Sequence, residues 1–325
     1  MRCLISTNSN PYFNLATEEY FLKSSREEIF MLYINEPCVV VGKHQNLLSE
    51  INLDYIRKNN IKLARRISGG GTVYQDFNNL NFSFIHNCEN RDQINFSKFT
   101  LPILEALNEM GIDAKLSGRN DLLINSEKIS GNAMHIYKTR VLAHGTLLFD
   151  TDLIKLSSAL KNNGDRYTDK SIKSVRSKVT NISDHLKNSI TTDQFSNALF
   201  QNIINAKDTR IKTLDQVEIN EISSNSKEKF ETWNWIYGYS PKYIFKNIFH
   251  IRNCSISVEL SIEKGIIGIA KILTDPVDLT IELEFENVLT GTQHDYDIIK
   301  EKIKVMPKIN SDATMLLSEY CDHLF

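Results

Sequence analysis

The sequence predicts an α+β protein, with mixed and antiparallel sheets and helices between the strands. Two observations support this class. In the first half, strand-like runs such as 29–34 and 38–41 are separated by short turns, whereas parallel strands need a crossover of about a dozen residues or more. After Pro241 a new pair of strand-like runs begins, and helical patterns follow it. We therefore expect a large α+β unit over residues 1–245 and a small α+β unit over 246–325.

Local patterns justify each element in turn. Pro11 stands near a first helical position, and the apolar residues that follow recur at helical spacing, which predicts a helix over 11–24. Runs of β-branched and aromatic residues predict strands, and Gly, Pro and Asn mark their ends. The further elements, in chain order, are strands at 29–34 and 38–41, a helix at 51–59, strands at 61–67 and 80–85, a helix at 98–110, strands at 121–124 and 141–149, a polar helical region at 186–228, strands at 255–262 and 266–273, and two helices toward residue 325.

The composition is that of an ordinary globular protein, with 41% hydrophobic and 24% charged residues among 325. The 38 basic and 40 acidic residues give a net charge of −2, which provides no general attraction to nucleic acids or to an anionic membrane. No apolar run approaches the roughly 20 residues of a membrane-spanning helix. The five cysteines are scattered and form no CxxC pair, so we expect a reducing, cytoplasmic setting.

The densest chemical signal is the run Arg-Arg-Ile-Ser-Gly-Gly-Gly-Thr-Val-Tyr at 65–74. Three consecutive glycines after a predicted strand allow positive φ and bring backbone N–H groups close to a ligand. The two arginines add permanently charged donors that suit phosphate or carboxylate oxygens. The run is not a dinucleotide fingerprint, because Tyr74 replaces the last glycine of that motif. By itself it fits either a flexible turn or an anion-binding loop.

A second cluster joins the run 118–121, the turn that leads to Lys128, and His144-Gly145-Thr146. An Asp or Asn where a loop meets a strand can hold a ribose, or a Mg²⁺ ion together with phosphate oxygens. Lys128, on the returning strand, is placed to neutralise two anionic ligands at once. The same residues also suit a plain hairpin with a solvated lysine.

Taken together and in chain order, these motifs resemble those of lipoate-protein ligases in the biotin/lipoate ligase superfamily. The matching segments, which span almost the full chain, are 14–19, 42–46, 65–73, 118–133, 144–148, 174–181 and 233–235. The resemblance implies a biotin/lipoate ligase-like catalytic domain at 1–245 and a C-terminal accessory domain at 246–325. It also implies the activity: lipoate reacts with ATP and Mg²⁺, pyrophosphate leaves, and the lipoyl group passes from AMP to a lysine. The implied acceptor is the lipoyl domain of an E2 dehydrogenase subunit or the glycine-cleavage H protein.

The resemblance also assigns roles to residues. Lys128 is expected to be catalytic, in contact with the lipoyl carboxyl group and the α-phosphate, and Asp121 to bind the metal. The residues expected to bind ATP or the adenylate are Arg66, Gly71, Thr72, Val73, Tyr74, Asn79, Asn120, Asp121, Lys128, Ala133, Lys173 and Arg176. The residues expected to bind lipoate are Arg65, Gly70, Gly71, Val41, Gly42, Asn46, Lys128, His144 and Gly145. The segment 171–180 is expected to close over the adenylate.

Two residues depart from the HDxGN pattern that commonly follows the glycines in this family. Gln75 replaces the histidine; it forms hydrogen bonds but does not titrate near neutral pH, which argues against a required acid–base role there. Asn78 replaces the glycine, and we expect it to accept positive φ, because Asn is one of the few residues that do so.

Three alternatives stay open at this point. An ATP-independent lipoyl or octanoyl transferase has the same fold; no cysteine lies between Cys88 and Cys254, which disfavours a cysteine nucleophile but not a transferase that depends on Lys128. Biotin is a second carboxylate that such a site can take. A protein that binds lipoate or its adenylate without catalysis is the third alternative.

Overall fold

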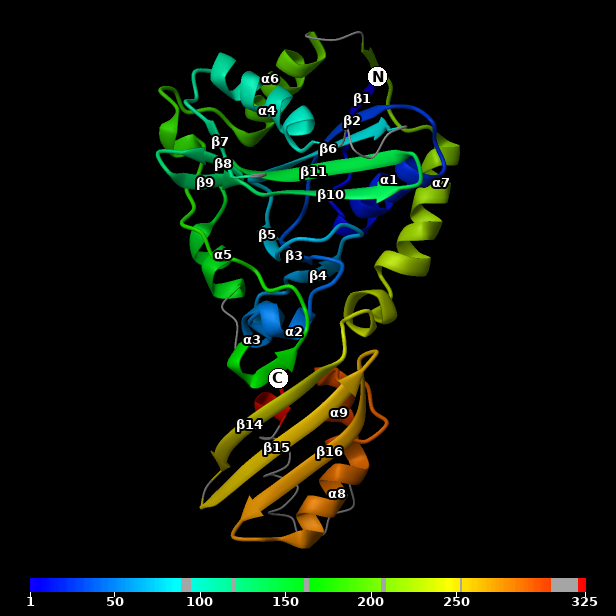
Figure 1. Ribbon diagram of the computed structural model, residues 1–325, viewed down its shortest axis with the longest axis vertical. Helices are drawn as coiled ribbons and strands as arrows, with labels where there is room; N and C mark the ends of the chain where they lie inside the picture. Colours follow the sequence, from blue (N-terminus) through cyan, green and yellow to red (C-terminus); the bar gives the residue numbers. More distant parts are fainter. Residues whose placement is uncertain (89–94, 119–120, 161–163, 206–208, 252, 305–320) are drawn as a thin grey trace. The chain divides into compact units, whose positions relative to one another are not determined.

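The α+β class is confirmed by the computed structural model, which describes residues 1–88, 95–118, 121–160, 164–205, 209–251, 253–304 and 321–325 (Figure 1). The chain forms two compact units, neither of them continuous in sequence. Unit 1 consists of 1–43, 61–158 and 174–232, and unit 2 of 44–60, 159–173 and 233–325. No helix within the described ranges is long and apolar enough to cross a membrane.

Unit 1 is built on a six-stranded mixed sheet with the strand order β10-β11-β6-β2-β1-β13 (Figure 1). Its strands are β1 (Arg2–Ile5), β2 (Ile29–Ile34), β6 (Asn79–Asn87), β10 (Asn132–Tyr137), β11 (Arg140–Leu148) and β13 (Arg210–Ile211). β1 is parallel to both of its neighbours, and the other pairs are antiparallel. The strands predicted at 29–34, 80–85 and 141–149 are confirmed, whereas β1, β10 and β13 were not predicted.

The main core of unit 1 lies between this sheet and the helices α4 (Ser97–Glu109) and α6 (Thr192–Asn205). Phe30 and Phe84 stack with their ring centroids 4.8 Å apart, and Phe99 of α4 and Phe200 of α6 pack on these rings. Burial of each such side chain contributes roughly 1.5–3 kcal/mol. Along β6 the side chains alternate, so Ser83 points away from this core, toward α1 (Pro11–Lys23). Ser83 and Glu18 of α1 therefore meet on the opposite face of the sheet from this core.

Two small sheets of unit 1 position the motifs. β4 (Lys62–Arg65), β3 (Cys38–Val41) and β5 (Val73–Gln75) form one, with β3 in the centre, parallel to β4 and antiparallel to β5. The glycine run thus connects two strands that both pair with β3. β7 (Lys115–Ser117), β8 (Asp121–Ile124) and β9 (Glu127–Ser130) form the other. Asn125 and Ser126, between β8 and β9, have φ of 49° and 68°, as a two-residue hairpin turn requires.

Unit 2 contains an antiparallel sheet with the order β12-β14-β15-β16. Its strands are β12 (Tyr167–Asp169), β14 (Tyr243–Ile251), β15 (Cys254–Glu263) and β16 (Ile266–Asp275). The helix α8 (Leu279–Leu289) packs on β16, and α9 (Tyr296–Lys304) follows it. At the β15–β16 turn, a Cβ on Gly265 would lie 2.4 Å from Cη2 of Trp233, so the turn requires glycine. The two strands and two helices predicted for this region are confirmed, and the predicted boundary at 245 falls within β14.

The other helices differ in extent from the predictions. They are α2 (Leu47–Glu50), α3 (Leu53–Lys58), α5 (Leu153–Ala159), α7 (Gln216–Asn225), two π-helical turns at Ser226–Phe230 and Asn234–Gly238, and 3₁₀ turns at Gly164–Arg166, Ser183–His185 and Cys321–His323. The helix predicted at 51–59 is shorter, and the region predicted as helical at 186–228 contains α6, β13 and α7. A capping box starts α7, because the Asp215 side chain accepts from the backbone N–H groups of Val217 and Glu218.

Candidate functional site

The glycine loop, residues 66–72, is organised by the guanidinium group of Arg66. Nη2 of Arg66 donates to the carbonyl oxygens of Gly69 and Gly71, both at 2.7 Å. Nη1 donates to the carbonyl oxygen of Val40 at 3.1 Å, and Nε to Oγ of Ser68 at 3.0 Å. Gly70 has a φ of 89°, a left-handed conformation that side chains rarely allow. The loop is therefore fixed with its carbonyl oxygens turned toward Arg66.

The charge of Arg66 is enclosed within unit 1, since the residue is only 6% exposed. Burial lowers the pKa of Arg66 to about 10, and the Glu18 carboxylate opposes this shift. The side chain is still cationic at neutral pH. Arg66 can thus assist an anionic ligand both through its charge and through the loop that it holds.

Arg65 is fully buried at the end of β4 and supports a neighbouring piece of backbone. Its Nη1 donates to the carbonyl oxygens of Gly42 and Lys43, at 3.0 and 3.2 Å. The backbone N–H of Lys43 in turn donates to the carbonyl oxygen of Ser68 at 2.8 Å. Val41, which is buried in β3, pairs with Arg65 in register. The predicted lipoate residues Val41, Gly42 and Arg65 therefore lie together, beside the start of the glycine loop.

The segment 174–180 lies against the glycine loop. The backbone N–H of Thr72 donates to Oγ of Ser174 at 2.9 Å, and a Cβ on Gly71 would lie 3.1 Å from that oxygen. Farther along, the Lys128 N–H donates to the carbonyl oxygen of Lys178 at 2.9 Å, and the Thr180 N–H to that of Lys128 at 3.1 Å. The segment thus connects the glycine loop with β9. Arg176 within it is exposed.

Lys128 on β9 forms an ion pair with Asp121 on β8. Nζ lies 3.0 Å from Oδ1, and the two side chains are 26% and 31% exposed. The lysine passes close to Gly131, where a Cβ would lie 3.3 Å from Nζ. Partly exposed ion pairs contribute about 0–1 kcal/mol, so Lys128 can exchange this carboxylate for another anion at little cost.

A buried chain of hydrogen bonds joins α1 to the glycine loop. Nδ1 of His144 lies 3.0 and 2.9 Å from the two carboxylate oxygens of Glu18. Nε2 of His144 lies 2.6 Å from Oγ of Ser68, which also accepts from Arg66. Tyr33 and Ser83 donate to Glu18 as well. Glu18 was not predicted as a site residue; the signal in the sequence that could have found it is its place in the matching segment 14–19.

Ala133 and Gly145 lie on the paired strands β10 and β11, next to this chain. Ala133 is opposite His144 in the register, and a Cβ on Gly70 would lie 3.7 Å from Cβ of Ala133. A Cβ on Gly145 would lie 1.9 Å from Oδ1 of Asn132 and 2.6 Å from Cζ of Phe82, so a larger residue at 145 would have to displace these side chains. Residues from distant parts of the sequence thus meet around the glycine loop.

Two predicted ligand residues belong to unit 2 instead. Asn46 donates to Oδ2 of Asp169 at 3.0 Å, and Nζ of Lys173 lies 3.0 Å from the same oxygen. Lys173 also donates to Oγ of Ser49 at 3.1 Å. Burial favours a raised pKa for Asp169, but hydrogen bonds from Ser171, Asn46 and Lys173 outweigh it, so the pKa is lowered. Asn46, which is fully buried, and Lys173, which is exposed, therefore share one polar cluster around Asp169.

The other predicted nucleotide residues lie on β5 and β6. Val73 and Tyr74 pair with Val40 and Val39 of β3, which sets their positions beside the glycine loop. Asn79 is fully buried; its Nδ2 donates to Asn81 at 3.0 Å, and its Oδ1 has no hydrogen-bond partner among the residues that the structure describes. Asn120 lies outside the described residues.

The two departures from the family pattern have distinct structural settings. Gln75 is buried, and its Oε1 accepts from Nδ2 of Asn35 at 2.7 Å, while Asn35 accepts from Asn14 at 2.8 Å. The backbone of Asn78 is not left-handed, so the tolerance of asparagine for positive φ is not used at this position. Its N–H donates to Asp76 at 3.0 Å, and its Oδ1 accepts from Thr192 at 2.9 Å, which stabilises another backbone conformation.

The described residues contain no group of three His, Cys, Asp or Glu side chains that could hold a metal ion. Asp121 is the first residue of β8, the middle strand of its small sheet, and its carboxylate lies beside Lys128. Mg²⁺ in nucleotide sites is usually bound by one or two carboxylates, with phosphate oxygens and water as the other ligands. A single aspartate therefore fits a magnesium ion that arrives with a nucleotide.

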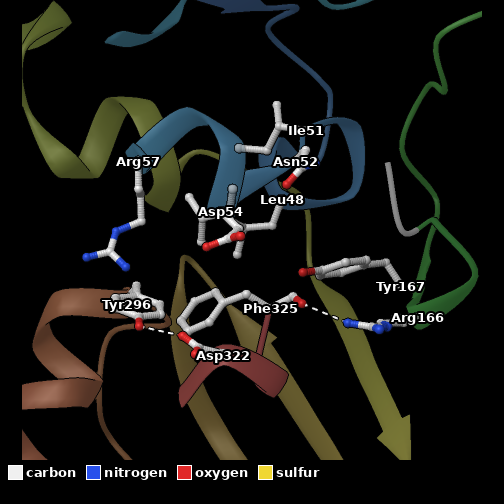
Figure 2. A pocket seen from close by; sticks show the side chains of 11 residues that line it. Leu48, Ile51, Asn52, Asp54, Arg57, Arg166, Tyr167, Tyr296, Asp322 and Phe325 are labelled. Carbon is white, nitrogen blue, oxygen red and sulfur yellow. Dashed lines mark hydrogen bonds between the residues drawn. The ribbon is translucent and has the colours of Figure 1, made fainter. Parts of the chain in front are cut away.

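Two cavities include neither the glycine loop nor Lys128 in their linings. One, of about 680 Å³ in unit 1, is lined by the 5–9 loop, Phe77, Asn78 and the start of α6, with no Lys, Arg or His in its lining. Its size suits a ligand, but it has no cation for a phosphate or carboxylate. The other is in unit 2, and Figure 2 shows Arg57, Tyr167 and Phe325 around it. At about 90 Å³ it is too small for ATP or lipoate.

The fold and the site define a class of protein: an α+β domain in which a glycine loop, a buried arginine and a nearby lysine suit a nucleotide and a carboxylate. The chain matches the family described as lipoyl protein ligase A/B catalytic domain over residues 10–204. It also matches bacterial lipoate protein ligase C-terminus over residues 240–315. The first match covers more than half of the chain, so the chain belongs to the lipoate-protein ligase family.

Named relatives agree with this family over most of their length. Lipoate-protein ligase LplJ of Bacillus subtilis is 39% identical over 304 residues, which are 91% of each chain. Lipoate-protein ligase 1 of Staphylococcus aureus is 40% identical over 303 residues, which are 92% of each chain.

Solved structures show the same fold with ligands or a partner. A lipoate-protein ligase A bound with ATP has a TM-score of 0.62 and 28% identity, covering 73% of this chain and 98% of that one. The protein LipL1 of P. falciparum in complex with lipoate has a TM-score of 0.60 and 26% identity, covering 98% and 99%. A structure of a bi-partite lipoate protein ligase and its E2 lipoyl domain from Thermoplasma acidophilum has a TM-score of 0.63 and 29% identity, covering 73% and 96%.

Proposed function

We propose that the protein activates lipoate with ATP and transfers the lipoyl group to a lysine of an acceptor protein. The observation that supports this most directly is the glycine loop that Arg66 holds, connected by the segment 174–180 to the strand of Lys128. Relatives about 40% identical over most of the chain are lipoate-protein ligases. Solved family structures are bound with ATP or in complex with lipoate.

In the first step of the proposed reaction, a lipoate carboxylate oxygen attacks the α-phosphorus of ATP. An oxygen–phosphorus bond forms, and the bond to pyrophosphate breaks. Both reactants are anions, so a cation close to both stabilises the transition state. Lys128 is proposed as that cation, and the glycine loop with Arg66 as the phosphate site.

In the second step, the ε-amino group of the acceptor lysine attacks the lipoyl carbonyl carbon. A carbon–nitrogen bond forms, the carbon–oxygen bond to AMP breaks, and the proton lost by the amine passes to water. Lys128 stays next to the carbonyl oxygen and the departing phosphate, where its charge stabilises both.

We propose Asp121 as the magnesium ligand, because its lone carboxylate beside Lys128 suits an ion shared with phosphates. A magnesium ion bound there would neutralise charge on the leaving pyrophosphate. The remaining assignments, to ATP or adenylate and to lipoate, are proposed for the residues named from the sequence. Support is strongest for Arg66, Gly71 and Thr72 of the glycine loop and for Ala133 and His144 beside it.

The proposal extends to the acceptor and the setting. The partner is a lipoyl acceptor protein, and we propose an E2 lipoyl domain or a glycine-cleavage H protein, without a nucleic-acid or membrane partner. The five cysteines form no disulfide, which agrees with the proposed reducing, cytoplasmic location. We also propose that catalysis belongs to residues 1–245, with 246–325 as an accessory domain.

A transfer assay tests the proposed function. Purified protein, MgATP, lipoate and an apo lipoyl domain are combined, and the acceptor is analysed by mass spectrometry. We expect lipoylated acceptor and stoichiometric pyrophosphate, both of them absent when ATP is left out. Transfer from a lipoylated donor protein without ATP would instead identify a transferase, and no transfer under either condition would identify a binding protein.

A further inference from the structure

We infer that Glu18 is a positioning residue of the ligase site, which sets the tautomer of His144 and, through Ser68, the orientation of Arg66 and the glycine loop. The inference deepens the proposed function and rests on it, because the glycine loop is taken as the phosphate site. Glu18 is on α1, far in sequence from the loop, and it is fully buried.

The donor and acceptor of each hydrogen bond between Glu18 and Arg66 follow from these two residues. The Glu18 carboxylate only accepts, so the nearby Nδ1 of His144 carries a proton. Nε of Arg66 only donates, so Oγ of Ser68 accepts from it. The hydroxyl hydrogen of Ser68 is then free to point to Nε2 of His144, 2.6 Å away. With Nδ1 of His144 protonated and Ser68 donating to Nε2, each donor in this chain of hydrogen bonds has an acceptor.

Burial makes this arrangement specific. Glu18 and Ser68 are 0% exposed and His144 is 6% exposed, so a group left without its partner cannot turn to water. A buried carboxylate costs several kcal/mol unless donors and an opposite charge offset it. His144, Tyr33 and Ser83 donate to Glu18, and the charge of Arg66 interacts favourably with it.

Arg66 and the glycine loop, at the other end of this hydrogen-bond series from Glu18, would contact the nucleotide. Ser68 fixes Nε of Arg66, and Nη2 of the same guanidinium binds the carbonyl oxygens of Gly69 and Gly71. A change in the donor pattern at Ser68 therefore shifts Arg66 and, with it, the loop. Removal of the Glu18 charge is expected to act on ATP binding without any contact between Glu18 and ATP.

Three variants of the full chain test this inference by ATP affinity. Glu18→Gln keeps the shape but removes the charge, and it replaces one of the two acceptor oxygens near Nδ1 of His144 with an amide donor. Ser68→Ala removes the hydroxyl group that links His144 to Arg66. Tyr33→Phe is the matched control, because it removes another donor to the same carboxylate and leaves the chain to the loop intact. We expect Kd for MgATP, measured by calorimetry, to rise about tenfold in the first two variants and less than twofold in the control.

The double variant Glu18→Gln with Ser68→Ala separates positioning from general destabilisation. If both residues act through the same chain, the double variant is no weaker than the single variants, since the second change has nothing left to remove. Additive losses of affinity would overturn the inference. So would unchanged ATP affinity in Glu18→Gln.

The tautomer of His144 gives a readout that needs no turnover. Nitrogen-15 spectra of histidine-labelled protein, with His144 assigned from the spectrum of His144→Gln, report which ring nitrogen is protonated. We expect Nδ1–H in the wild type and Nε2–H in Glu18→Gln, and Nε2–H in the wild type would overturn the inference. If the wild type binds no MgATP, the proposed function fails instead, and the spectra alone then decide the role of Glu18.

Discussion

The ion pair between Lys128 and Asp121 is weak enough to be exchanged for contacts with other charged groups. The two charges are 3.0 Å apart but about a quarter to a third exposed, so water screens them. An ion pair of this kind holds the lysine side chain in a defined place but contributes little to the free energy of unfolding. In the proposed reaction, Lys128 would exchange the aspartate for a phosphate or carboxylate oxygen, and Asp121 would then be available to a magnesium ion.

Replacement of Lys128 by alanine is expected to stop adenylate formation. The variant loses the cation between the two anionic reactants, an interaction of the kind that costs about 10²–10³ in rate when removed. Pyrophosphate release with lipoate and MgATP measures the effect. The unfolding temperature is expected to change little, because the lost ion pair is partly exposed.

Lys115→Ala is the matched control for this prediction. Lys115 lies on β7 of the same small sheet and pairs with Asp113 in an exposed ion pair. Pyrophosphate release should match the wild type in this control. Wild-type activity in Lys128→Ala would remove Lys128 from the proposed mechanism.

At the scale of elements, His294 ties the C-terminal turn to the sheet of unit 2. Its Nε2 lies 2.7 Å from the carbonyl oxygen of Leu324, which only accepts, so Nε2 carries the proton. Nδ1 then accepts from the hydroxyl of Tyr243 on β14, at 2.7 Å. The ring stacks on Phe325 with a centroid distance of 4.6 Å. A neutral imidazole satisfies all of these contacts.

Because these contacts need a neutral His294, the free energy of unfolding is expected to fall in mild acid. Burial lowers the pKa of His294 from 6.5 to about 4 in the folded state. Between these two values the unfolded state binds a proton that the folded state does not, so stability decreases as pH falls through that range. The full loss is about 3 kcal/mol. Urea unfolding at pH 7 and pH 4.5 measures it.

His294→Gln is expected to weaken this pH dependence, even if the variant is less stable at both pH values. His250→Gln, at an exposed position on β14, is the control and should retain the wild-type difference between pH 7 and pH 4.5. An unchanged pH difference in His294→Gln would assign the acid sensitivity to other groups.

At the scale of the whole molecule, local signals in the sequence predicted most of the elements and the glycine loop. The hairpin that contains Lys128 is set by its own turn residues, Asn125 and Ser126, and such local chemistry can be read from one sequence. The chain from Glu18 to Arg66 could not be predicted, because it depends on how α1, β11 and the loop meet in three dimensions. β13 has only two residues, and pairing with β1, not its own pattern, defines it.

The sequence also did not predict which segments of the protein make up unit 2. The segment 44–60 was predicted within the first domain, yet it packs with residues near the end of the chain. Arg57 lies 3.4 Å from the centre of the Tyr296 ring and 2.6 Å from Asp297, and the backbone N–H of Leu47 donates to Ser240 at 3.4 Å. No local pattern indicates these partners, because each contact spans about 190 residues or more.

A truncated protein that ends at residue 245 is therefore expected to have a lower unfolding temperature than the full-length protein. The truncation removes Tyr296 and Phe325, which together with Leu48 and Ile51 line the small cavity in Figure 2. Leu48 and Ile51 are 5% and 2% exposed, and loss of their burial costs roughly 1.5–3 kcal/mol each. At about 2–4 °C per kcal/mol, the unfolding temperature should fall by about 10 °C.

The control is Arg57→Ala in the full-length protein, which removes only a partly exposed ion pair and a ring contact. This variant should lower the unfolding temperature by far less. An unchanged unfolding temperature in the truncated chain would show that residues 44–60 need no partner beyond 245, and would favour the simple division at that residue.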